Sequence, residues 1–250
     1  MEEERSPNNG IIVKVEDLHK AYFLGKNAIP ALRGIDFELK HGELVCIMGP
    51  SGCGKTTLLN IIGGIDRPDR GSVKFEGVEL TSLSDNQLAD LRLSKISFVF
   101  QFYNLLPLLS AKENVEIPLV FSGVDKHTRE KRAIELLHLV GLKGREDHLP
   151  TELSGGEQQR VSISRAMAND PILMISDEPT GDLDSSSAKN ILEILHKLNK
   201  EFGMTILMVS HDRRIALMCD RILHMLDGKI TKEEQTPGIT GSLLDESIKT

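Results

Sequence analysis

Apolar residues occur along much of the chain in short runs bounded by glycine or polar residues. Runs of this length, rich in Val, Ile, Leu and Phe, predict buried β-strands. They cover residues 11–16, 35–39, 43–48, 73–75, 78–80, 96–100, 172–176, 205–209 and 221–226. The stretch 172–175 contains no polar residue, which is typical of a parallel strand covered on both faces.

A helical pattern replaces the strand pattern over about residues 102–168. Apolar residues recur there at the spacing of an amphipathic helix, and Gly141 predicts its end. These residues are Ala133, Ile134, Leu136, Leu137 and Val140. Helices are also predicted at 57–62, after the capping-box pair Ser84 and Gln87, and at 187–202. Since strands and helices alternate on both sides of this insert, we predict an α/β protein with an inserted α-helical subdomain.

The segment after the predicted strand 43–48 has the spacing G-x-x-x-x-G-K-[ST] and leads into a predicted helix. Such a loop turns backbone N–H groups inward around phosphates. Lys55 is expected to reach the β- and γ-phosphates, and the Thr56 hydroxyl to bind Mg²⁺. A chance glycine turn is the alternative, but it arises in only about one chain in a hundred of this size. The residues expected to bind nucleotide here are Gly49, Pro50, Ser51, Gly52, Cys53, Gly54, Lys55, Thr56 and Thr57.

Two carboxylates follow the predicted strand at 172–176. Asp177 and Glu178 lie at its carboxyl end, where α/β sheets bind ligands. One carboxylate there suits a metal ligand, and the next suits a base that activates water. An acidic loop that caps a neighbouring helix is the alternative.

The segment 153–160 reads Leu-Ser-Gly-Gly-Glu-Gln-Gln-Arg. Taken alone, Ser154 before two glycines is a helix N-cap with a flexible approach. It is also a second helix N-terminus able to bind phosphate in a chain with one phosphate loop. Such a site makes sense if it serves the nucleotide of another subunit.

Charge and composition exclude several classes of protein. The chain has 250 residues, with 30 Lys and Arg against 37 Asp and Glu, a net charge of −7. An acidic balance argues against general nucleic-acid binding. No apolar run approaches the length of a membrane span, and the N-terminus lacks the profile of a signal peptide. We therefore expect a cytoplasmic protein whose membrane role comes through a partner.

The three cysteines, Cys46, Cys53 and Cys219, are too few and too scattered for a disulfide framework or a metal cluster. Cys46 and Cys219 lie in apolar sequence, so we expect both to be buried. Cys53 lies in the phosphate loop beside Lys55, an environment in which cysteines react readily. We expect Mg-ATP to protect Cys53 from alkylation.

The segment 153–160 resembles the signature motif of ABC ATPases, and their other motifs follow in order. Gln101 resembles the Q-loop glutamine that touches the metal and the attacking water, and residues 181–184 resemble the D-loop. His211 resembles the switch histidine at the γ-phosphate, and Tyr22 resembles the aromatic that stacks on adenine. The resemblance implies a P-loop NTPase core with an N-terminal antiparallel β subdomain. It also implies that Ser154, Gly155, Gly156, Gln158 and Asp184 bind nucleotide.

The resemblance implies hydrolysis of Mg-ATP by a dimer of this chain that powers a separate membrane permease. Glu178 would be the base and Lys55 would offset charge, while Asp177, Thr56 and Gln101 would hold the metal. The protein would then lie on the inner face of the membrane through its permease. Residues 98–107 and 113–115 are similar to the branch for lipoprotein release, macrolide export and cell division.

Two other functions stay open. One is a regulatory ATPase that controls an enzyme beyond the membrane, and the other is a soluble ATPase acting on DNA or ribosomes. The apolar stretch 102–109 is a candidate surface for the permease, or ordinary core of the insert. Cys53, Ser176 and Asp182 depart from the family pattern, and Asp182 puts a charge in the D-loop. We expect a flexible N-terminus over 1–10, the ATPase domain over 11–230 and a loosely attached polar tail over 231–250.

Overall fold

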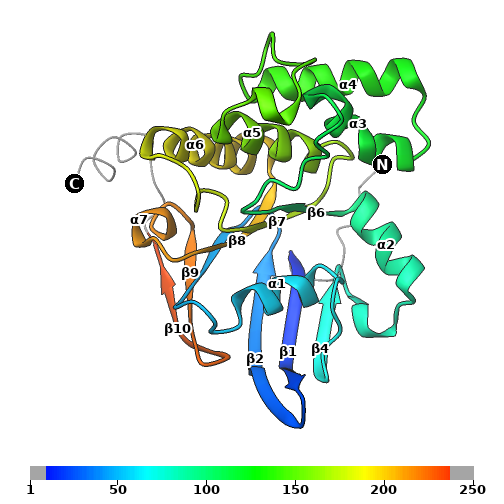
Figure 1. Ribbon diagram of the computed structural model, residues 1–250. Helices are drawn as coiled ribbons and strands as arrows, with labels where there is room; N and C mark the ends of the chain where they lie inside the picture. Colours follow the sequence, from blue (N-terminus) through cyan, green and yellow to red (C-terminus); the bar gives the residue numbers. More distant parts are fainter. Residues whose placement is uncertain (1–9, 237–250) are drawn as a thin grey trace, which may run out of the picture.

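The computed structural model describes residues 10–236, in which two sheets pack on either side of a helix (Figure 1). Residues 1–9 and 237–250, most of the expected flexible N-terminus and polar tail, lie outside the described residues. The first sheet is antiparallel, in the order β2-β1-β4-β5. Its strands are β1 (Ile11–Leu24), β2 (Asn27–Lys40), β4 (Arg70–Phe75) and β5 (Val78–Glu79).

The second sheet has the order β10-β9-β3-β8-β7-β6. Neighbouring strands from β9 to β6 run parallel, and only β10 is antiparallel to its neighbour. These strands are β3 (Leu44–Met48), β6 (Ile96–Val99), β7 (Leu173–Asp177), β8 (Thr205–Ser210), β9 (Arg221–Leu226) and β10 (Lys229–Gln235).

Helices cover both faces of the parallel sheet. Helix α1 (Lys55–Ile62) packs between the two sheets, while α5 (Gly155–Ala166), α6 (Ser185–Phe202) and α7 (Arg213–Ala216) cover the opposite face. Helices α3 (Ala111–Phe121) and α4 (Lys126–Leu139) pack on α5, and α2 (Asp85–Ser94) lies beside β6. Short 3₁₀ turns occupy Leu80–Ser82 and Pro150–Glu152.

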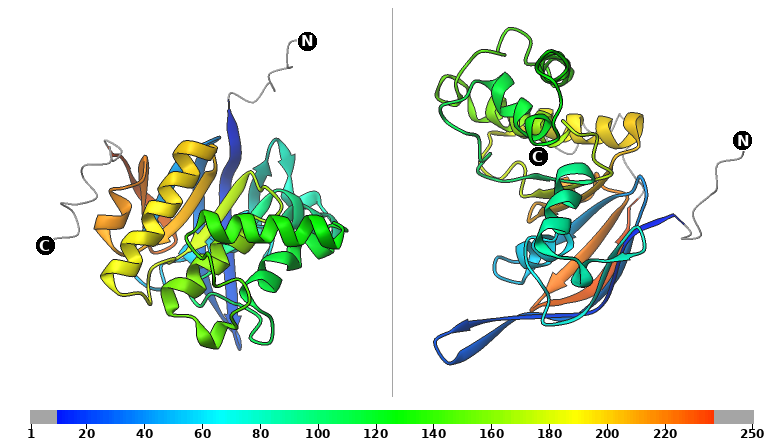
Figure 2. Two further views of the ribbon diagram at one scale, coloured as in Figure 1. Left: turned by 90° about the horizontal axis from the view of Figure 1, so that it is seen from above. Right: turned by 90° about the vertical axis from the view of Figure 1, so that its right-hand side faces the viewer.

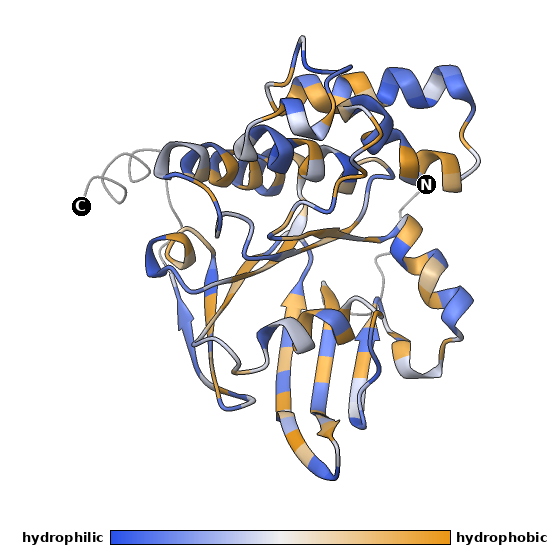
Figure 3. Cartoon of the chain, in the orientation of Figure 1, coloured by the Kyte–Doolittle hydropathy of each residue, from blue (hydrophilic) through white to orange (hydrophobic). Residues whose placement is uncertain are grey.

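The unbroken apolar strands supply two separate cores. In β7, Leu173 and Ile175 belong to the core around α1, whereas Met174 belongs to the core under α5 and α6. Successive side chains of a strand point to opposite faces, so a strand buried on both faces needs apolar residues at every position. Figure 3 shows this contrast, with hydrophobic central strands and a largely hydrophilic α4.

The strands at 11–16 and 35–39 are longer than the sequence predicts. They continue into a hairpin that extends beyond the body of the molecule (Figure 2). Phe23 and Leu24 near its tip are exposed. Since no core covers the tip, its residues carry no alternation of apolar and polar positions.

The predicted domain boundary at residue 230 falls inside β10. The expected polar tail therefore begins as a strand, whose register pairs Glu233 with Leu223 and Gln235 with Arg221. The strand lies at the edge of the sheet, where charged side chains are common. Its Lys and Glu residues give it no apolar pattern from which a strand could be predicted.

Arg221 joins the two sheets. Its side chain is almost buried, and its guanidinium donates to the Glu38 carbonyl of β2 at 2.6 Å. It also donates to the carboxylates of Glu43 at 3.0 Å and Glu233 at 2.8 Å. One charged group thus links β2, the start of β3, β9 and β10.

Replacing Arg221 by Met should lower the free energy of unfolding by about 3 kcal/mol, because the Glu43 carboxylate and the Glu38 carbonyl would lose their buried partner. Arg70→Met is the matched control. Arg70 pairs with Asp17 at 2.7 Å, but both side chains are more than half exposed, so its loss should cost under about 1 kcal/mol. Denaturant titrations of both variants check this, and equal losses would contradict the structural role of Arg221.

Candidate functional site

The loop between β3 and α1 depends on two glycines. A Cβ on Gly49 would lie 2.1 Å from the Met225 carbonyl oxygen, and one on Gly54 would lie 2.4 Å from that of Ala31. Gly54 also has a φ of 104°, which side-chain-bearing residues rarely adopt. The neighbouring backbone therefore excludes any larger residue at either position.

Lys55 is the first residue of α1 and lies within this loop. It is 6% exposed, and its ammonium donates to the carbonyls of Gly49 and Pro50, each at 2.9 Å. Two of its three donors are thus directed at the loop. The N-cap Gly54 has no side chain, so no side-chain cap bonds the first N–H groups of α1. This combination of a buried cation and free N–H groups suits an anion.

Thr56 and Asp177 come together from α1 and β7. The Thr56 hydroxyl donates to the Asp177 carboxylate at 3.0 Å. Burial raises the pKa of Asp177, and the adjacent Glu178 carboxylate raises it further. Hydroxyl and carboxylate oxygens are ligands of the kind that Mg²⁺ prefers. Within residues 10–236 no three His, Cys, Asp or Glu side chains form a metal cluster.

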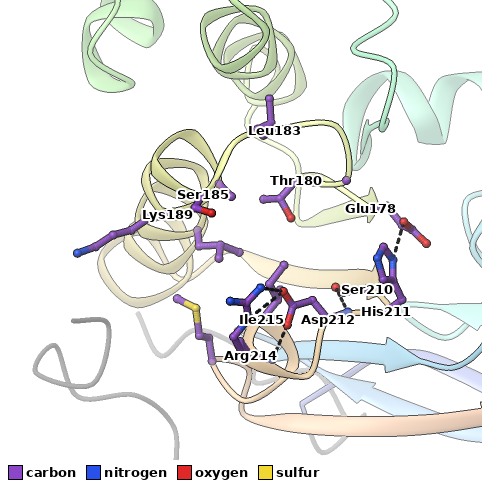
Figure 4. A pocket seen from close by; sticks show the side chains of 14 residues that line it. Glu178, Thr180, Leu183, Ser185, Lys189, Ser210, His211, Asp212, Arg214 and Ile215 are labelled. Carbon is purple, nitrogen blue, oxygen red and sulfur yellow. Dashed lines mark hydrogen bonds and ion pairs between the residues drawn. The ribbon is translucent and has the colours of Figure 1, made fainter. Parts of the chain in front are cut away.

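Glu178 and His211 face each other across the ends of β7 and β8 (Figure 4). Nδ1 of His211 lies 3.0 Å from a Glu178 carboxylate oxygen. Glu178 has a φ of 45°, and its N–H donates to the Val209 carbonyl at 3.2 Å. This backbone turns the Glu178 side chain out of the strand, next to Asp177. The two residues border a cavity of about 220 Å³ that extends toward α6 and α7, and residues 49–57 do not line it.

Gln101 and Tyr22 lie at two edges of this site. Gln101 follows β6, and its amide packs so closely on Gly181 that a Cβ there would lie 3.1 Å from Nε2. The Tyr22 hydroxyl donates to Asp66 at 2.7 Å and lies beside Thr57. Burial raises the pKa of Tyr22, and the Asp66 carboxylate adds to this.

The segment 153–160 begins helix α5 as a capping box. The Glu157 N–H donates to the Ser154 hydroxyl at 3.3 Å, and the Ser154 N–H donates to the Glu157 carboxylate at 2.8 Å. Gly155 packs against Tyr103, and Gly156 packs against Ser187. No hydrogen bond of the described residues joins Ser154, Gly155, Gly156 or Gln158 to the loop 49–57. Within residues 10–236, hydrogen bonds therefore do not connect these two motifs.

Asp184, expected from the resemblance to bind nucleotide, has a structural partner in the described residues. It caps α6, because its carboxylate accepts from the N–H groups of Ser186 and Ser187 at 3.0 Å each. A role toward nucleotide stays a prediction.

The family model described as ABC transporter matches residues 32–181. The chain belongs to this family. Its part there is the ATP-binding and ATP-hydrolysing subunit. It is 47% identical to an uncharacterized ABC transporter ATP-binding protein of Thermotoga maritima, over 92% of this chain and 98% of that protein. A similar ATP-binding protein of Methanocaldococcus jannaschii is 45% identical over 91% of this chain and 98% of its own length.

Two dimeric structures of the M. jannaschii ABC cassette share the fold. Each has a TM-score of 0.85 at 44% identity, over 91% of this chain and all of theirs, and one holds ADP and Pi after hydrolysis. Other ABC relatives are longer. The chain spans 44% of ABC transporter H family member 2 of Dictyostelium discoideum, at 49% identity over 91% of this chain. No helix among residues 10–236 is long and apolar enough to cross a membrane.

The expectation that Cys53 of the ABC phosphate loop lies in a reactive environment is wrong. Cys53 is only 5% exposed, because its side chain points into the core beside α1 and lies against Gly49. Cys46 and Cys219 are buried as expected. The loop thus presents its backbone outward and its cysteine inward.

Sequence reasoning also missed Gln159 and Arg165 of the ABC signature helix α5. Gln159 contacts the Phe100 and Pro179 carbonyls, and Arg165 contacts those of Tyr103 and Asn104. Since the partners are backbone carbonyls, the sequence contains no complementary side chain from which these contacts could be predicted. The available signals were a glutamine on the buried face of a helix and Asn104, a residue type that tolerates a positive φ.

The burial of Cys53 predicts slow alkylation by N-ethylmaleimide at all three cysteines of the native protein, with or without Mg-ATP. Unfolding in guanidinium should make all three react rapidly, which serves as the internal control. Peptide mass mapping of a labelling time course measures each site. Native labelling of Cys53 as fast as in the unfolded chain would contradict its buried position.

Proposed function

We propose that two copies of this chain hydrolyse Mg-ATP at composite sites and thereby drive a separate membrane permease. One observation carries the proposal: Lys55, the Thr56–Asp177 pair and the Glu178–His211 pair meet at the ends of three adjacent parallel strands. This arrangement places an anion cradle, oxygen ligands and a base at one edge of the sheet.

The nucleotide would bind along α1. Backbone N–H groups of residues 49–57 and the Lys55 ammonium would hold the phosphates, and Tyr22 beside Thr57 would stack on adenine. Mg²⁺ would be held by Thr56 and Asp177, with Gln101 nearby. When bound, the ion offsets charge on the β- and γ-phosphate oxygens.

Hydrolysis requires a water oriented for attack on the γ-phosphorus. Glu178 would accept a proton from this water as its oxygen bonds to phosphorus and the bond to the β-phosphate oxygen breaks, yielding ADP and inorganic phosphate. His211 would donate a hydrogen bond to the γ-phosphate, and its contact with Glu178 fixes the spacing of the two groups. A positioned base is worth about 10²–10⁴ in rate.

The second half of each site would come from the partner copy. Ser154, Gly155, Gly156 and Gln158 lie at a helix N-terminus that does not contact its own phosphate loop. A two-fold dimer presents each of these ends to the other chain's nucleotide. The dimeric M. jannaschii cassette supports this arrangement.

The permease would dock beside β6. Phe121 is 76% exposed and lines a groove between α2, α3 and α5. Phe102 and Leu108, in the candidate stretch 102–109, are 73% and 88% exposed. A groove with exposed apolar side chains at its wall suits a protein interface. The macrolide export ATP-binding/permease protein of Mannheimia succiniciproducens, 44% identical over 94% of this chain and 36% of its own length, combines both parts in one chain. We infer a related export or extraction role, at the inner face of the membrane.

Glu178→Gln should abolish phosphate release while Mg-ATP binding persists, because the amide keeps the shape of the carboxylate but cannot accept the proton. The expected loss in kcat is about 10²-fold or more. Phosphate release and equilibrium nucleotide binding measure the two effects. Turnover equal to that of the wild-type protein would refute the role of Glu178 as base.

A mixed dimer tests whether the site is shared. One copy carries Lys55→Ala and its partner carries Ser154→Arg, both with Glu178→Gln to block turnover. One composite site then has both lesions, and the other pairs an intact Lys55 with an intact Ser154. Tandem-tagged mixed dimers should trap about one Mg-ATP, whereas either homodimer traps none.

The outcome separates the two arrangements, since motifs acting within one chain would leave a lesion in every site of the mixture. No trapping by a mixed dimer that folds normally would therefore refute the composite site.

A further inference from the structure

We propose that Gln159 is a positioning residue that holds the backbone beside Gln101 and the backbone beside Glu178 at a fixed separation. The inference deepens the proposed function and rests on it. Gln159 lies on α5, five residues after the signature serine Ser154, and its hydrogen bonds reach neither the Gln101 amide nor the Glu178 carboxylate. It would act on hydrolysis only through the two loops that carry Gln101 and Glu178.

The Gln159 amide bridges these loops directly. Its side chain is fully buried. Nε2 donates to the Pro179 carbonyl at 2.7 Å and to the Phe100 carbonyl at 3.4 Å. Pro179 follows Glu178 in the chain, and Phe100 precedes Gln101. A primary amide is the neutral side-chain group with two N–H donors on one nitrogen, so one residue satisfies one carbonyl in each loop.

The other side of the Gln101 loop is held by the same helix. Arg165 donates to the Tyr103 carbonyl at 2.8 Å and to the Asn104 carbonyl at 2.6 Å. Both residues have a positive φ, 56° for Tyr103 and 50° for Asn104. Two successive residues with side chains in this region are strained, so the guanidinium stabilises a turn that the chain would otherwise leave.

Side chains of helix α5 therefore hydrogen-bond the backbone on both sides of Gln101 and the backbone on one side of Glu178. Gly155 at the start of the helix also packs on Tyr103. Backbone-type N–H···O bonds span about 2.7–3.2 Å between heavy atoms, so the 3.4 Å contact of Gln159 with the Phe100 carbonyl leaves little room for further movement. A shift of α5 relative to the sheet consequently moves the Gln101 loop or breaks the Gln159 bridge.

The test replaces Gln159 by Met, which has a similar size and no donors. Both carbonyls then lose a buried partner, and kcat for ATP should fall about ten- to a hundredfold. The KM for ATP should stay within about twofold, because no residue of the phosphate loop is touched. The Asn side chain of Gln159→Asn is one methylene shorter and reaches only one carbonyl. The kcat of this variant should therefore lie between those of Gln159→Met and the wild type.

Ser162→Ala is the matched control. Ser162 lies on the same helix and is equally buried, but its hydroxyl has no hydrogen-bond partner among the described residues. This variant should keep the wild-type kcat. Hydrogen–deuterium exchange adds a readout that general destabilisation would not produce. Peptides over 100–104 and 178–183 should exchange faster in Gln159→Met, while α4 stays unchanged.

The outcomes separate the two proposals. A wild-type protein without ATPase activity would refute the proposed function itself. An active wild type with equal kcat in Gln159→Met and Ser162→Ala would overturn the role of Gln159 alone. So would exchange that rises across the whole protein in Gln159→Met, because this would mean that Gln159 only stabilises the fold.

Discussion

The parallel register of β3, β8 and β7 is the constraint on which the site depends. Met48 pairs with Ser210, and Val209 pairs with Asp177. The residues just past these strands are therefore neighbours, although about 160 positions separate Gly49 from His211 in the chain. A slip of one residue in any of these pairs would turn each side chain to the other face. It would also separate Thr56 from Asp177 and Glu178 from His211.

The sheet keeps this register because both of its faces are filled. Alternate residues of each central strand enter different cores, so no shifted pairing could bury an equivalent set of side chains. Arg221 adds a polar restraint, since its guanidinium needs partners on β2, β10 and the approach to β3 at once. Packing and this buried charge thus fix the strands from which the chemistry projects.

The sequence predicts the parts of this structure that leave a local trace. The phosphate loop, the two carboxylates, the capping box at Ser84 and the N-cap at Ser154 combine particular residue types at fixed spacing. Strand β10 leaves none, because this edge strand carries polar residues like a loop. The tip of the long β1–β2 hairpin leaves none either, because its exposed residues do not alternate between apolar and polar. The burial of Cys53 and the contacts of Gln159 depend on elements far away in the chain. A single-chain pattern does not contain that information.

The proposed sharing of each site between the phosphate loop of one copy and Ser154 of the other has a kinetic consequence. A composite site makes hydrolysis an encounter reaction, so dilute copies would meet rarely and turnover per chain would rise with protein concentration. A permease that holds two copies side by side would replace this search with a high effective concentration, on the order of millimolar for short tethers. The folded chain could then accumulate without consuming cellular ATP until it is assembled where the energy is used.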